Sequence, residues 1–101
     1  MSIQSHLSDD GQELRISIKE RFDFSAHQEF RRSYESLSVR PARYVVDLAE
    51  TTYLDSSALG MLLLLRDHAG EDNASVEIKN CNADVKKILI ISNFEQLFNI
   101  Q

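Results

Sequence analysis

The amino-acid sequence predicts an α/β protein in which a mixed β-sheet packs against helices. Segments with alternating or β-branched apolar residues take turns with segments whose apolar residues recur at helical spacing. The first two strand-like segments are joined by Ser8-Asp9-Asp10-Gly11, a sequence typical of a tight hairpin turn. This hairpin makes the sheet mixed, and the expected order is β-β-α-β-α-β-α with a short C-terminal element.

The N-terminal hairpin is expected to lead into the first helix. Residues 1–7 are weakly patterned and suit an edge strand, whereas residues 14–18 alternate between apolar and polar, as in a strand with one buried face. Ser25 and Gln28 have the spacing of a capping box, in which each side chain binds a free backbone N–H group. The first helix should therefore run from about Ser25 to Leu37.

The next predicted strand covers residues 43–48, where Tyr44-Val45-Val46 is typical of a buried central strand. Asp47 is placed near the end of this strand. Residues 50–52, Glu-Thr-Thr, are expected to form a polar connection to the second helix.

The second helix is predicted from Ser56 or Ser57 to about Ala69. Its apolar run over residues 58–65 is the most hydrophobic part of the chain. Gly70 is expected to end the helix in the left-handed conformation, which glycine adopts without the usual steric penalty.

A further strand and helix complete the predicted domain. Residues 74–79 alternate like a strand, and Asn82-Ala83-Asp84 starts the third helix. The helix is expected to carry a broad apolar face, made of Val85, Ile88, Leu89, Ile90 and Ile91. Residues 94–100 suit one helical turn followed by an edge strand.

The composition excludes several classes of protein. A chain of 101 residues favours one domain, residues 1–101, and its size is compatible with a monomer. The net charge of −5 argues against binding to nucleic acid. Cys81 is the one cysteine, and together with the lack of a signal peptide this predicts a cytoplasmic protein. The longest apolar run is too short to cross a membrane.

The motifs of common enzymes are missing from the sequence. There is no glycine-rich nucleotide loop and no Gly-x-Ser-x-Gly, and the three histidines are far apart without ligand spacing. Asp47 and Asp55 are better explained by a strand end and a helix cap than by a catalytic pair. We therefore expect no enzyme activity, no metal and no cofactor.

Ser56 and Ser57 at the start of the second helix allow two interpretations. Serine is a preferred N-cap, so one hydroxyl could simply bind a free backbone N–H group. A phosphate at the same place would meet free N–H groups and the positive end of the helix dipole. It would also add charge to a surface expected to be rimmed by Asp47, Glu50 and Asp55.

Two stretches of the sequence resemble a known family. Val45-Val46-Asp47-Leu48 followed by Leu54-Asp55-Ser56-Ser57-Ala58-Leu59-Gly60 is similar to the signature of STAS domains, specifically the bacterial anti-sigma-factor antagonists. Phe22-Asp23-Phe24 also resembles the segment before the first helix of that family. The family often has glycine at the positions of Glu20 and Ala58, so this chain departs from the pattern there.

The resemblance implies a phosphoswitch. Ser56 would be phosphorylated by a GHKL-type serine kinase, often itself an anti-sigma factor, and a PP2C-type phosphatase would remove the phosphate. The unphosphorylated form would bind its partner and the phosphorylated form would release it. Asp23, Asp55, Ser57 and Ala58 would surround the phosphorylation site. Response regulators that carry such kinase or phosphatase domains are further expected partners.

Two alternatives from other classes of protein remain at this point. The chain could be a constitutive interaction or scaffold subunit in which Ser56 is only a helix cap. It could also be a small enzyme with Ser56 as its nucleophile, although the sequence supplies neither a base nor an oxyanion motif.

Overall fold

The structure, a computed structural model, describes residues 3–71 and 73–101 and confirms the α/β class with a mixed sheet. Five strands follow the order β1-β2-β3-β4-β5 across the sheet. The strands are β1 (Ile3–Leu7), β2 (Glu13–Phe22), β3 (Arg43–Leu54), β4 (Ser75–Lys79) and β5 (Asn99–Ile100). The hairpin partner β1 is antiparallel to β2, and the remaining neighbours are parallel.

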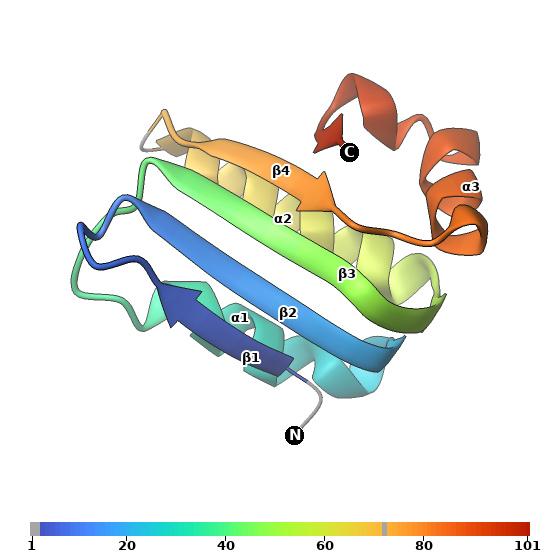
Figure 1. Ribbon diagram of the computed structural model, residues 1–101, viewed down its shortest axis with the longest axis horizontal. Coiled ribbons are helices and arrows are strands. Elements are labelled where there is room, and N and C mark those ends of the chain that lie inside the picture. The colour runs from blue at the N-terminus through green and yellow to red at the C-terminus, as the bar shows by residue number, and fades with distance from the viewer. Residues whose placement is uncertain (1–2, 72) are drawn as a thin grey trace.

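Two of the three described helices cover one face of the sheet, and the third lies to its side. They are α1 (His27–Glu35), α2 (Ser56–Glu71) and α3 (Ala83–Ile91), with short 3₁₀ turns η1 (Phe24–Ala26) and η2 (Phe94–Gln96). Figure 1 shows α1 and α2 behind the sheet, whereas α3 lies to the side, beyond β4. The core forms between this face and the helices because Leu14, Ile16 and Ile18 of β2 point to the same side as their buried counterparts on β3.

The opposite face of the sheet carries ion pairs. Arg15 pairs with Asp47 at 3.3 Å, and Arg43 pairs with Glu13 at 3.3 Å. Val45 lies in the same row of side chains as Arg15 but is only 1% exposed. The charged side chains therefore shield the apolar centre of this face from water.

The third strand extends beyond its predicted end at Leu48. It continues to Leu54, so residues 50–52 are part of β3 rather than a loop. The pairing with β2 shifts twice, and each shift adds one residue to β3. Thr51 is accommodated inside the fold because its hydroxyl donates to the Ile18 carbonyl at 2.8 Å. The prediction of a polar connection at residues 50–52 is therefore wrong, because these residues form the bulged part of β3.

The first and second helices are bounded by residues other than those predicted. Asp23, not Ser25, caps the first turn, because its carboxylate accepts the Ser25 backbone N–H at 3.0 Å. A 3₁₀ turn forms there, and α1 begins only at His27. Gly70 lies within α2, and the left-handed residue that follows this helix is Asn73, with φ of 56°.

The start of α3 is confirmed, but its apolar face is only partly buried. Asn82 caps the helix by accepting the Val85 N–H at 2.8 Å. Only Val85 and Leu89 of the helix are buried, whereas Ile91 is 70% exposed. The helix lies beside the sheet rather than across it (Figure 1), so a single stripe of its side chains reaches the core. The predicted terminal turn and edge strand are η2 and β5.

Glu20 adopts the left-handed conformation, with φ of 62°, although it has a Cβ atom. We expect Glu20→Gly to raise the free energy of unfolding by about 0.5–1 kcal/mol, because glycine removes the steric penalty of this conformation. The substitution should keep the contact with Thr52, because the Thr52 hydroxyl donates to the backbone carbonyl of residue 20 and the Glu20 side chain is exposed. Chemical denaturation measures the change, with Lys19→Gly, outside the left-handed region, as the matched control. A loss of stability in both variants would contradict the expected strain at Glu20.

Asp47 lies in the middle of β3 and accepts hydrogen bonds from Ala49 N–H and Asn80 as well as Arg15. Burial raises its pKa, but the hydrogen bonds and Arg15 together hold that pKa below its usual range. The carboxylate therefore stabilises the fold at neutral pH, and this contribution is lost as the pH falls below about 4. We expect Asp47→Asn to lower the free energy of unfolding by about 1–2 kcal/mol at pH 7. Denaturation at several pH values should show this difference shrink progressively as the pH falls below about 4, and a difference independent of pH would contradict the prediction.

Candidate phosphorylation site at the ends of β2 and β3

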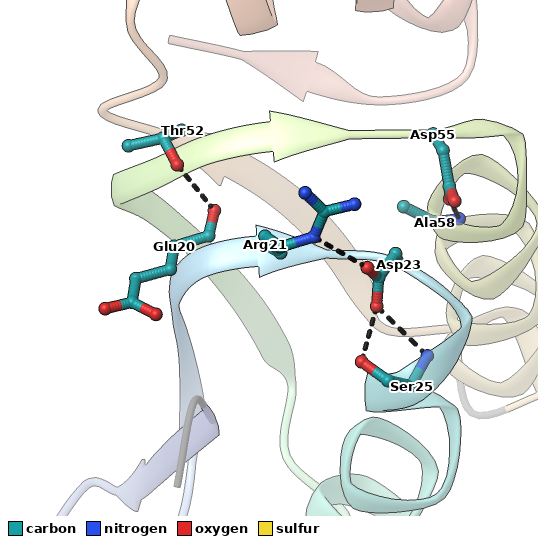
Figure 2. Close-up of polar contacts among 7 residues, drawn as sticks. All are labelled: Glu20, Arg21, Asp23, Ser25, Thr52, Asp55 and Ala58. Carbon is teal, nitrogen blue, oxygen red and sulfur yellow. Dashed lines mark hydrogen bonds and ion pairs between the residues drawn. The ribbon is translucent and has the colours of Figure 1, made fainter.

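The candidate site lies where β2 and β3 end side by side. These parallel strands are paired up to Phe22 and Leu54, so the next residues, Asp23 and Asp55, leave the same edge of the sheet. Figure 2 shows both aspartates at this edge, each at the start of a helical segment. Sites in α/β proteins commonly form at the carboxyl ends of parallel strands. The fold thus brings together two acidic residues that are far apart in the sequence.

Asp55 is the cap of α2. Its Oδ1 atom accepts the backbone N–H of Ala58 at 3.1 Å (Figure 2), and its backbone carbonyl accepts the N–H of Leu59 at 3.2 Å. Ser56 is therefore the first helical residue rather than the cap. The interpretation of Ser56 as only a helix cap is wrong, because the neighbouring carboxylate already performs this role.

The side chains of the first turn of α2 differ in accessibility. Ser56 is exposed, Ser57 is half-buried, and Ala58 is 0% exposed. Within the described part of the chain, the Ser56 hydroxyl forms no hydrogen bond. Ala58 contributes its backbone N–H to the site while its methyl group packs in the core. Of the two serines, Ser56 is therefore the more accessible to a second protein.

Asp23 is held by several donors at the neighbouring strand end. It accepts the N–H and the hydroxyl of Ser25, and the Nε atom of Arg21 lies 3.0 Å from its Oδ2 atom (Figure 2). The hydrogen bond from Ser25, followed by that from Arg21, lowers the pKa of Asp23 below its usual range. Asp23 is therefore an anion at neutral pH, fixed close to the start of α1.

Sequence reasoning missed Arg21 and Tyr53 at this edge. They are register partners on β2 and β3, and Cζ of Arg21 lies 4.4 Å from the centroid of the Tyr53 ring. The two-residue spacing of Arg21 and Asp23 was a usable signal, because such residues share one face of a strand. The pairing of Arg21 with Tyr53 depends on the bulges in β3, and the sequence contains no pattern that predicts it.

The predicted acidic rim is only partly correct. Asp47 is engaged with Arg15 and Asn80 in the middle of β3. It precedes Asp55 by eight residues of largely extended chain, which corresponds to on the order of 20 Å. Asp47 therefore lies away from the site, and Asp23, which is distant in sequence, lies at the same edge as Asp55.

The start of α2 can accommodate an added negative charge. An exposed hydroxyl stands at the N-terminal end of a long helix, where backbone N–H groups and the dipole favour an added anion.

Among the described residues, no group of three or more potential ligand side chains is arranged to hold a metal ion. No helix in the described ranges has the length and apolar character needed to cross a membrane.

Comparisons with known proteins agree with this fold. The family model described as "Mlab, STAS domain" matches residues 5–99. A STAS-domain containing protein of Pseudomonas aeruginosa (strain UCBPP-PA14) is 64% identical over 100 residues, covering 99% of each chain.

Two solved structures of SpoIIAA share the fold at low sequence identity. The unphosphorylated form of this anti-sigma factor antagonist matches with a TM-score of 0.84 and 14% identity, covering 98% of this chain and 87% of that one. The phosphorylated form of the Bacillus protein matches with a TM-score of 0.75 and 13% identity, covering 98% and 90%. The residues matched by the family model and the close relative together show that this chain belongs to the STAS-domain family.

Proposed function

We propose that this chain is an anti-sigma-factor-antagonist-like adaptor controlled by phosphorylation of Ser56. The unphosphorylated form binds a regulatory protein, and the phosphorylated form releases it. A GHKL-type serine kinase, which can itself be the anti-sigma factor, adds the phosphate, and a PP2C-type phosphatase removes it. The protein acts in the bacterial cytoplasm as a single non-catalytic domain, and a response regulator carrying such domains is a further candidate partner.

The observation that carries this proposal is the division of roles between Asp55 and Ser56. Asp55 caps α2 through the N–H of Ala58, so the exposed Ser56 hydroxyl has no structural role in the helix start. A kinase can therefore modify Ser56 without removing a contact that stabilises the fold.

The local electrostatics favour a switch of binding over a switch of folding. A phosphate on the first residue of α2 lies at the positive end of the dipole, which stabilises the modified helix. The same phosphate adds about −1.5 to −2 charges beside Asp23 and Asp55. A partner that covers this acidic edge would then meet strong repulsion and would have to desolvate a dianion.

The structural neighbours support this interpretation. SpoIIAA is an anti-sigma factor antagonist whose structure is known in unphosphorylated and phosphorylated forms. Both forms share the fold of this chain, which is compatible with a modification that leaves the fold intact. The chain's own partners are part of the proposal and follow from the family resemblance.

The proposal predicts opposite effects of two substitutions at Ser56. Ser56→Ala should keep the fold and bind its partner constitutively, whereas Ser56→Asp should weaken binding at least tenfold, about 1.4 kcal/mol, because it adds charge to the acidic edge. Differential capture from the source bacterium identifies proteins retained by Ser56→Ala and lost by Ser56→Asp. Titration calorimetry with the purified partner then measures the affinities.

Ser57→Ala and Ser57→Asp provide the matched controls, since Ser57 lies one residue further along the same helix but is half-buried. Equal partner affinity of wild type and Ser56→Asp would favour a constitutive scaffold. Incubating the captured kinase with ATP and the wild-type chain should place phosphate on Ser56, and phosphate found only elsewhere would contradict the site.

A further inference from the structure

Arg21 lies beside the candidate phosphorylation site, on the neighbouring strand. Its register partner on β3 is Tyr53, which precedes Ser56 by three residues. The Cζ atom of Arg21 lies 4.4 Å from the centroid of the Tyr53 ring. A cation over an aromatic ring is attracted by its negative face. Tyr53 therefore holds the guanidinium group at the end of the two strands, on the strand pair that leads into α2.

The contact with Asp23 uses the Nε atom of Arg21 and not its two terminal nitrogen atoms. The Nε atom of Arg21 lies 3.0 Å from Oδ2 of Asp23. In Figure 2 the two terminal nitrogen atoms lie on the side of the guanidinium group that faces β3, away from the contact with Asp23, and one of them points to the side on which Asp55 lies. A guanidinium group is a planar fork of N–H donors that suits two-pronged contacts with phosphate.

The ion pair between Arg21 and Asp23 can be exchanged at little cost. The Arg21 side chain is 65% exposed and the Asp23 side chain is 18% exposed, and ion pairs near the protein surface contribute little to stability. A phosphate dianion carries more charge than a carboxylate and accepts stronger hydrogen bonds from a guanidinium group. Asp23 would still be held by the N–H and the hydroxyl of Ser25 after losing Arg21.

We propose that Arg21 is a phosphate-binding residue of the phosphorylated form. When Ser56 carries a phosphate, the guanidinium group leaves Asp23 and donates to the phosphate oxygens while staying on the Tyr53 ring. This inference rests on the proposed phosphorylation of Ser56. It adds a second consequence of the modification, because the Asp23 carboxylate loses its cation at the moment when the phosphate appears. The charge distribution at this edge thus changes at two positions, at Ser56 through the added phosphate and at Asp23 through the loss of its ion pair.

The test measures the second pKa of phosphoserine installed at position 56 during translation, by following the phosphorus NMR shift against pH at low salt. A nearby cation stabilises the dianion and lowers this pKa from its usual value of about 6. Arg21→Gln should therefore raise the pKa by about 0.5 unit or more relative to the wild-type background. Arg21→Lys retains the charge and should keep most of the lowering.

Arg66→Gln is the matched control, because Arg66 lies ten residues beyond Ser56 on α2 and its Nε atom contacts the Leu97 carbonyl. It should leave the phosphoserine pKa within about 0.1 unit, since screening removes most of its effect at that distance. His27, at the start of α1, is present in every variant, so it does not enter the comparison. The same pKa in wild type and Arg21→Gln, or an equal rise in Arg66→Gln, would overturn the proposal.

The measurement needs neither the kinase nor the binding partner. A negative result would remove Arg21 from the phosphorylated site and leave Ser56 as the proposed switch. Failure of the binding experiments with Ser56 variants would instead remove the switch, whatever the phosphoserine pKa shows.

Discussion

The parallel pairing of β2 with β3 is the constraint on which the site depends. Because the two strands run in the same direction and stay paired up to Phe22 and Leu54, the segments that follow them start at one edge of the sheet. Asp23 and Asp55 then each accept a backbone N–H at the beginning of the helical segment that follows. The bulges in β3 set this register, so the edge would be rearranged if β3 lost its extra residues.

At this edge, the residues that stabilise the start of α2 are different from the residue proposed to be phosphorylated. Asp55 satisfies the helix start and Ala58 packs in the core, so the first turn of α2 is fixed without the Ser56 hydroxyl. A modification at Ser56 can therefore change the charge of the surface while the contacts below it stay in place. On the far face of the sheet, pairs such as Arg15 with Asp47 belong to a different, structural set of charges.

Sequence patterns predicted most of the fold because alternation and helical spacing are local properties. The hairpin, the three helices and the cap at Asn82 could be recognised from neighbouring residues alone. The end of β3 could not, because Thr51 is accommodated by the carbonyl of Ile18, which is remote in the sequence. The contact between Arg21 and Tyr53 was missed for the same reason, since it exists only in the folded register. The motif around Ser56 indicated the candidate site, whereas the structure decided between Asp55 and Ser56 as the cap.

In the proposed mechanism, phosphorylation of Ser56 changes the surface at one edge of the sheet and leaves the fold unchanged. Proton–nitrogen correlation spectra of the wild-type chain with and without phosphoserine at position 56 test this claim most directly. We expect chemical-shift changes confined to the ends of β2 and β3 and to the first turn of α2, with the amide signals of β4 and of the C-terminal half of α2 unchanged. Shifts spread through β4 and the whole of α2, or a loss of signal dispersion, would contradict it.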